Sequence, residues 1–258
     1  SGSNQDEFAA SQDGNGSYHF EAWRNGYYTI IAVDDAGWIT ESDRIEVRNI
    51  DTLDPQKAAV ETVNPPDNAE TGYYVETSPE LKIVAGDTEA GSLYDSAVSG
   101  VYTIQIETRQ MTREEFSSGV EDFTDSAYDE SAPYTKGETL EYDGGVNGIK
   151  YVITATSSVW VRVITTDKAG RTSVSDPILL KIDKDAPQFW VSLEDEGQNG
   201  AWTNKDIVFE LSGVDTDGKL KYFISTDYDQ AYPERATWTE IAQYAEENDL
   251  IWTKDESA

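Results

Sequence analysis

The feature that most constrains the fold of this 258-residue chain is a segment that occurs twice. Tyr18–Trp38 aligns without a gap with Tyr151–Arg171, at a constant offset of 133 positions. Both copies are rich in aromatic and β-branched residues, which is typical of strands. We therefore expect at least two related β units. The identical pairs are Tyr18/Tyr151, Ala22/Ala155, Asp34/Asp167, Ala36/Ala169 and Gly37/Gly170.

Each copy is expected to form two strands and a turn. In the first copy, Asn25-Gly26 predicts a two-residue hairpin of type I′, because that turn needs a positive φ at both positions. In the strand that follows, successive residues point to opposite faces, so Ile31 and Val33 would face away from their neighbours. The residues expected to share one face are Tyr28, Ile30 and Ala32 in the first copy, and Val159, Val161, Val163 and Thr165 in the second.

An Asp-x-Ala-Gly sequence follows in both copies, at Asp34–Gly37 and Asp167–Gly170. An Asp side chain accepts hydrogen bonds from backbone N–H groups two residues on, and Gly adopts the left-handed conformation, so both sequences predict tight turns. A last strand then runs into a proline, Pro55 in "IDTLDP" and Pro187 in "IDKDAP". Because proline cannot donate to a sheet, each proline marks a unit boundary.

The residues after the two prolines match each other more weakly. Ser78–Gly91 resembles Asn204–Gly218 as a strand that ends in an acidic turn, and Ser99–Glu107 resembles Gly218–Thr226 as the next strand. Each is followed by a capping box, a Thr with a Glu three residues later, which predicts a short helix. The capping boxes are Thr112/Glu115 and Thr237/Glu240, with Phe116, Val120 and Phe123 or Ile241, Tyr244 and Ala245 on the buried side.

The order of strand, Asp-x-Ala-Gly turn, last strand and Ile-Asp-x-x-x-Pro linker resembles the bacterial immunoglobulin-like repeats of large secreted and cell-wall surface proteins. Those repeats usually have Asn after the turn, where this chain has Trp38 and Arg171. The resemblance implies an all-β fold of tandem immunoglobulin-like β-sandwiches with Greek-key connections, here with one short helix per repeat. It also implies an extracellular location and spacer, adhesion or matrix roles.

Phased on the prolines, residues 56–187 form one complete immunoglobulin-like domain. Residues 1–55 match only the later strands of a domain, and residues 188–258 only the earlier strands and the helix. Three explanations stay open: a longer repeat protein cut at polar loops, completion of residues 188–258 by residues 1–55 of another chain, or terminal domains that are small but whole. Pairing of both ends within one chain fits less well. The expected partners are other copies of the chain, in a head-to-tail fibre, or neighbouring repeats.

The chain carries 50 acidic and 19 basic residues, a net charge of −31. This charge repels phosphate backbones, so we do not expect nucleic-acid binding. The sequence has no apolar stretch of about 20 residues, so we do not expect membrane insertion. The charge suits solubility at a crowded surface or the binding of cations. Cysteine is absent, which excludes disulfides and thiolate metal sites. The one histidine, His19, lies in an expected strand and no catalytic motif appears, so we expect a protein that is not an enzyme.

Two acidic turns are candidate calcium sites. Asp215 and Asp217 stand two residues apart before a Gly, like the start of an oxygen-ligand loop, and Asp87 and Glu89 occupy the corresponding turn of the other unit. No Glu follows at EF-hand spacing, so an Asx turn that closes a hairpin is the alternative for both. The linker acids could also bind Ca²⁺ and stiffen the joint between units; they are Asp51, Asp54, Asp183 and Asp185.

Gln110–Gly148 is a longer connection than a hairpin needs and holds aromatic residues among acids. Exposed rings stack on sugar faces and carboxylates accept hydroxyl protons, so a module that binds a host glycan or protein is the second functional hypothesis. Alternatively, the rings cover the edge of the sheet as part of the core. The candidate ligand-binding residues are Tyr128, Tyr134 and Tyr142, with Phe116 and Phe123 in the same segment.

Overall fold

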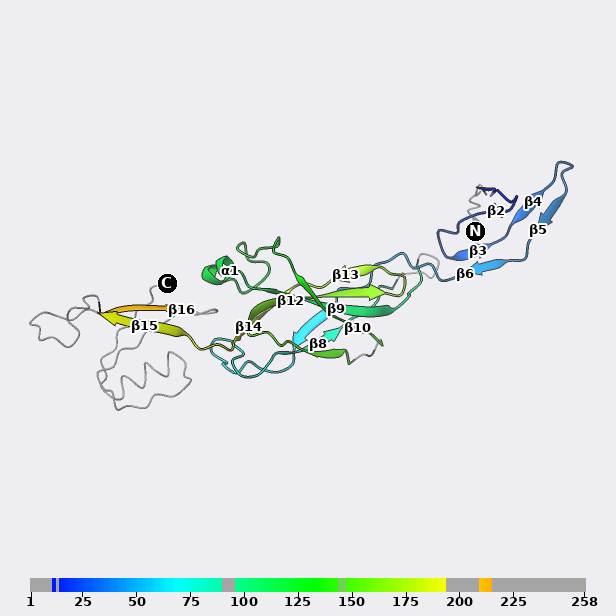
Figure 1. The fold of residues 1–258 in the computed structure, drawn as a ribbon. Coiled ribbons are helices and arrows are strands. Elements are labelled where there is room, and N and C mark those ends of the chain that lie inside the picture. Colours follow the sequence, from blue (N-terminus) through cyan, green and yellow to red (C-terminus); the bar gives the residue numbers. More distant parts are fainter. Residues whose placement is uncertain are drawn as a thin grey trace, which may run out of the picture.

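The computed structural model of this chain describes residues 11–12, 14–89, 96–143, 145, 147–193 and 209–214. These residues form an all-β fold of antiparallel sheets with one short helix, as the sequence predicts. Figure 1 shows an N-terminal, a middle and a C-terminal group of strands, one after another along an elongated arrangement.

The bounds of the elements follow chain order within the three groups. The N-terminal group contains β1 (Ser11–Gln12), β2 (Tyr18–His19), β3 (Gly26–Tyr28), β4 (Ile31–Val33), β5 (Ile39–Glu41) and β6 (Ile45–Val47). The middle group contains β7 (Ala59–Thr62), β8 (Glu80–Val84), β9 (Val101–Gln110), α1 (Arg113–Ser118), β10 (Thr135–Glu141), β11 (Ile149–Val152), β12 (Ser157–Asp167), β13 (Thr172–Val174) and β14 (Ile178–Asp183). The C-terminal group contains β15 (Gln188–Leu193) and β16 (Phe209–Val214).

The middle group consists of two antiparallel sheets that share a hydrophobic core. One sheet has the order β10-β9-β12-β13, with β14 also paired to β12, and the other has the order β11-β8-β7. Leu81 and Ile83 of β8 belong to the same buried cluster as Val161 and Val163 of β12. The smaller sheet therefore covers the apolar face of the larger one.

β12 is the central strand of the larger sheet and has the burial pattern that its sequence predicts. It pairs with β9 along one edge and with β13 and β14 along the other. Val159, Val161, Val163 and Thr165 are buried, which confirms their predicted common face. Asp167 continues the same alternation and is only 1% exposed. The apolar face of β12 thus ends in a buried carboxylate.

The N-terminal strands repeat the pairing scheme of β12. β3 pairs with β6 and β4 pairs with β5, just as β12 pairs with β14 and β13. The registers agree as well: Tyr28 lies opposite Ile45, and 133 positions later Val161 lies opposite Ile178. The offset found in the sequence is therefore also the offset between the two strand ladders.

The predicted Asn25-Gly26 hairpin is wrong. Gly26 begins β3, whose partner is β6 and not a strand before Asn25. The buried Asn25 side chain instead holds the backbone of Ile50: Nδ2 donates to the Ile50 carbonyl and Oδ1 accepts its N–H, both at 2.8 Å. The Ser158 hydroxyl, 133 positions later, bonds the N–H and the carbonyl of Ile182 in the same way. A long-range contact fixes the conformation here, and a local turn does not.

The alternation predicted for the first copy does not lead to burial. Ile31, Val33, Trp38 and Ile39 are each at least 60% exposed. The shared core begins only at Ala58. These side chains are exposed because the sheet of β7, β8 and β11 packs on β12 and not on the N-terminal strands. The described N-terminal strands contribute no residue to the shared core.

β15 and β16 form an antiparallel pair in the C-terminal group. β16 lies within the strand predicted at Asn204–Gly218. The remaining C-terminal predictions, among them the Thr237/Glu240 capping box, lie outside the described residues. The side chains of β15 that are more than half exposed are Phe189, Trp190 and Val191.

Candidate metal centre

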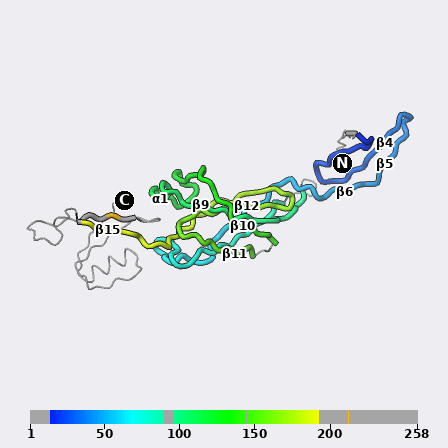
Figure 2. Tube along the Cα trace, in the orientation of Figure 1, coloured from blue at the N-terminus to red at the C-terminus, as the bar shows by residue number. Residues whose placement is uncertain are grey.

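Three carboxylates from distant parts of the sequence meet where the N-terminal strands join the middle group. Asp51 lies in the connecting segment, residues 48–58, which Figure 2 traces from β6 into the middle group. Asp87 follows β8, and Asp167 is the last residue of β12. One carboxylate oxygen of each lies within 4.8 Å of the other two. At this distance two unit charges repel each other by about 3 kcal/mol at an effective dielectric constant of about 20.

The loop before β9 positions two of the three carboxylates. Asp51 Oδ2 accepts the N–H of Ser99 at 3.0 Å, and Asp87 Oδ2 accepts the N–H of Gly100 at 2.6 Å. Gly100 has a φ of 84°, in the region that favours glycine. The N–H of Lys168 donates to the Gly100 carbonyl, which ties the same loop to the end of β12. The carboxylates are therefore arranged around one short piece of backbone.

Asp51 is held in its ionised form. Burial disfavours the charge, but hydrogen bonds from Ser99, Leu53 and Ser96 outweigh burial and lower the pKa of Asp51. The Leu53 N–H and the Ser96 hydroxyl both donate to Oδ1, at 3.2 and 3.0 Å. Hydrogen bonds of this kind favour a carboxylate over a carboxylic acid.

Asp167 has one oxygen without a partner. Its Oδ1 accepts the N–H of Arg171 at 2.8 Å, and Asp34 Oδ1 accepts the N–H of Trp38 in the matching N-terminal turn. Asp167 Oδ2 has no hydrogen-bond partner although it is buried. Burying a carboxylate oxygen without a partner carries a large free-energy cost, so this atom needs an explanation. A bound cation would supply the missing interaction.

The nearest positive side chains do not neutralise the cluster. Arg171 donates through Nε to the Asp51 carbonyl and pairs with Asp54 at 3.2 Å. The Lys168 ammonium lies near Gly100, where an added Cβ would stand 3.7 Å from its Nζ. In the part of the chain that the structure describes, no lysine or arginine forms an ion pair with any of the three clustered carboxylates.

The sequence indicates part of this centre. Asp87 is a predicted calcium ligand that belongs to the cluster, whereas Glu89 is exposed and lies outside it. Asp51 is a predicted linker ligand that also belongs, whereas Asp54 pairs with Arg171. Asp167 is missed, although it is the shared acid at the end of an alternating strand. Asp215 and Asp217 lie outside the described residues.

The other predicted linker acids form a local turn. Asp183 Oδ1 accepts the N–H of Asp185 at 3.2 Å, just as Asp51 Oδ1 accepts the N–H of Leu53 at 3.2 Å. Both linkers therefore begin with the same Asx-type hydrogen bond. Within the described residues, only the Asp51 linker reaches a group of acids that could hold a metal ion.

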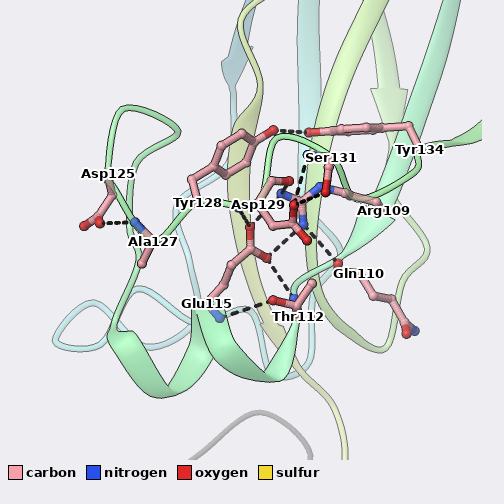
Figure 3. Close-up of polar contacts among 10 residues, drawn as sticks. All are labelled: Arg109, Gln110, Thr112, Glu115, Asp125, Ala127, Tyr128, Asp129, Ser131 and Tyr134. Carbon is pink, nitrogen blue, oxygen red and sulfur yellow. Dashed lines mark hydrogen bonds and ion pairs between the residues drawn. The ribbon is translucent and has the colours of Figure 1, made fainter.

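The Gln110–Gly148 segment contains the predicted capping box. Thr112 Oγ1 accepts the N–H of Glu115 at 3.2 Å, and the Thr112 N–H donates to Glu115 Oε2 at 2.8 Å, which caps α1. Glu115 also accepts two hydrogen bonds from Arg109, at 2.6 and 2.8 Å, in a buried ion pair (Figure 3). Burial raises the pKa of Glu115, but Arg109 and the N–H groups of Thr112 and Asp129 lower it to about 2.

Tyr128 and Tyr134 pack into this cluster and do not form an open platform. Their hydroxyls are 3.0 Å apart, and the Tyr128 ring packs edge-on against Trp160 at 4.8 Å (Figure 3 shows the two tyrosines). The Arg109 guanidinium lies 4.7 Å from the Tyr128 ring, and Arg162 lies 4.0 Å from the Tyr134 ring. Cation–π contacts therefore occupy the rings expected to stack on sugars.

The prediction for Tyr142 as a ligand-binding residue is wrong, because its ring belongs to the hydrophobic core. Its hydroxyl accepts the N–H of Ala85 at 3.1 Å, so the polar end of the side chain is also satisfied. Val120 is buried as predicted, while Phe116 and Phe123 are only half-buried. The segment thus covers the sheet, as the alternative interpretation expects.

No protein-family model and no curated protein matches this sequence. Among the described residues, no helix is long and apolar enough to cross a membrane.

Proposed function

We propose that this chain is an architectural, non-enzymatic segment of a bacterial extracellular surface protein. It is built from immunoglobulin-like units joined end to end, with residues 56–187 as a complete domain and residues 1–55 and 188–258 as parts of further domains. It acts as a spacer stalk or as the subunit of a head-to-tail fibre. The observation that carries this proposal is the joint between the N-terminal strands and the middle group.

The joint is made by hydrogen bonds to the backbone of the connecting segment. The Ile50 carbonyl accepts from Asn25 Nδ2 on the N-terminal side and from the Ala97 N–H on the middle side, both at 2.8 Å. The Thr52 N–H donates to Ser96 Oγ at 2.8 Å. A spacer must transmit orientation from one unit to the next, and a linker bonded on both sides does this better than a free one.

The fibre alternative is supported by apolar strands exposed at both ends of the described chain. Trp38 and Ile39 are exposed in the N-terminal group, and Phe189 and Trp190 are exposed in the C-terminal group. In the middle group, β12, the strand equivalent to β3 and β4, is covered by β9 and by the smaller sheet, whereas Ile31 and Val33 of β4 are exposed. Strands supplied by residues 188–258 of a second copy could cover the N-terminal group by strand addition.

Light scattering against protein concentration separates the two alternatives. A fibre subunit gains mass with concentration, and the gain is lost when residues 1–55 are removed or when Ile39→Asp breaks the exposed apolar surface. Tyr102→Asp, which changes an exposed ring of the middle group, is the matched control and leaves the association intact. A chain that stays monomeric is a spacer stalk. A monomer whose small-angle scattering fits freely jointed units would contradict both alternatives.

A further inference from the structure

The carboxylate cluster at the joint is electrostatically incomplete. Asp51, Asp87 and Asp167 bring three like charges within 4.8 Å of one another. Asp51 and Asp87 are half-buried and their oxygens accept backbone N–H groups, but the buried Asp167 Oδ2 accepts none. An acidic cluster alone can simply be solvated. A buried, unpartnered carboxylate oxygen within such a cluster points to a ligand with positive charge.

We propose that Asp51, Asp87 and Asp167 bind one calcium ion, which fastens the connecting segment to the middle group. Calcium takes about six to eight oxygen ligands in flexible geometry, and three carboxylates offer oxygens from three directions, with water completing the shell. The hydrogen bonds from Ser99 and Gly100 hold two of the ligands in place before the ion arrives.

The donor set favours calcium over other metals. Zinc sites combine cysteine or histidine with any carboxylates, and this chain has no cysteine and only His19, which lies in β2 and outside the cluster. Magnesium demands a near-ideal octahedron and keeps most of its waters. The three carboxylates come from separate segments, and that of Asp167 is fully buried. Such a cluster is better matched to calcium, which is larger than magnesium and less strict in its geometry.

The positive groups beside the cluster set the affinity. Lys168 stands near Gly100, and Arg171 is bonded to the Asp51 carbonyl and to Asp54, so both weaken the attraction for an added cation. We therefore expect a dissociation constant in the range of extracellular modules, about 0.1–1 mM. All three ligands lie in one chain, so calcium binds whether or not the chain self-associates.

The test compares Asp167→Asn with Asp34→Asn after removal of divalent ions with a chelator. Asp34 occupies the same turn in the N-terminal group, where its Oδ1 accepts the N–H groups of Ala36 and Trp38, and it is exposed and outside the cluster. Calorimetric titration with CaCl₂ should give equal affinities for the wild type and Asp34→Asn. Asp167→Asn should bind at least about tenfold more weakly, because a charged ligand is lost.

Thermal unfolding gives a second test of the calcium site, because the difference in stability between the wild type and Asp167→Asn should change sign when calcium is added. Without calcium, Asp167→Asn should be at least as stable as the wild type, because the variant has no unpartnered buried charge. With calcium at about ten times the wild-type dissociation constant, the wild type should gain about 3–6 °C in Tm and the variant about 1 °C or less. A residue with a merely structural role would lower stability under both conditions.

Three results would overturn the calcium site. They are the absence of saturable binding below about 10 mM CaCl₂, well above the expected range; equal affinities of Asp167→Asn and the wild type; and magnesium binding as tight as calcium binding. If Asp167→Asn does not fold, Asp87→Asn replaces it in the titration with the same expected loss. The fibre alternative is judged separately, by light scattering in chelator.

Discussion

Single carboxylates organise much of the backbone in this acidic chain. Asp67 Oδ2 accepts the N–H groups of Val75, Glu76 and Thr77, each at 2.9 Å, and these bonds lower the pKa of Asp67 to about 2. Asp34 and Asp167 close equivalent turns in the same manner. Part of the large negative charge therefore has a structural use, since an ionised side chain is a strong acceptor for backbone N–H groups.

The structural role of an ionised carboxylate can be tested at Glu115 by measuring stability as a function of pH. Glu115→Gln should destabilise the fold by about 3–5 kcal/mol at neutral pH, because the buried Arg109 loses its counter-ion. The pKa of Glu115 is lowered from 4.5 to about 2, so its contribution is complete above the unfolded value and is lost as the pH falls towards the folded value. The difference in the free energy of unfolding between the wild type and the variant, measured by urea unfolding, should shrink as the pH falls from 4.5 to about 2.

Glu114→Gln is the matched control, because Glu114 is the preceding residue of α1 and is exposed. It should change stability by no more than about 1 kcal/mol, the range of a charge near a helix N-terminus. A Glu115→Gln variant as stable as this control, or a difference that stays constant as the pH falls, would show that the ion pair does not stabilise the fold.

The sequence predicts an element correctly where its local signal is strong and no long-range contact opposes it. The alternation in β12 and the Thr112/Glu115 capping box depend on neighbouring residues, and the structure has both. Asn25-Gly26 has an equally strong local signal, yet the contact between Asn25 and Ile50 overrides it across 25 residues. The carboxylate cluster is predicted only in part for the same reason: Asp51, Asp87 and Asp167 meet through tertiary packing, which no local pattern encodes.

Asn25 therefore provides a test at the level of the element. Asn25→Ala removes both hydrogen bonds to Ile50 and should cost about 1–3 kcal/mol locally, which raises the hydrogen-exchange rate of the Ile50 amide by about tenfold or more. Asn25→Ser should retain most of the protection, because Ser158 makes the equivalent pair of bonds to Ile182. Equal exchange in the alanine and serine variants would contradict the proposed equivalence of the two strand ladders.

At the scale of the whole molecule, hydrogen bonds from one side of the middle group hold the connecting segment, residues 48–58. Arg171 and Ser173, on either side of the start of β13, donate to the carbonyls of Asp51 and Gln56, at 3.2 and 2.9 Å. The Gln56 N–H donates to the Gly86 carbonyl at 3.0 Å. The connecting segment is thus bonded at Asp51 and Gln56 to the start of β13, and at Gln56 also to Gly86. We expect the direction of the N-terminal strands to depend on these contacts.

Removing the hydrogen bonds from Arg171 and Ser173 should make the joint between the N-terminal strands and the middle group flexible. In the double variant Arg171→Ala/Ser173→Ala, the loss of about 1 kcal/mol per hydrogen bond should raise the exchange rate of the Gln56 amide about tenfold and broaden the distance distribution from small-angle scattering. Arg113→Ala removes a positive charge from an exposed residue of α1, away from the joint, and should leave both measurements unchanged. Unchanged scattering in the double variant would mean that the Asn25 and Ala97 bonds to Ile50 suffice to hold the joint. A broadened distribution that narrows again on addition of calcium would place the cation and these hydrogen bonds at the same joint, acting on the same motion.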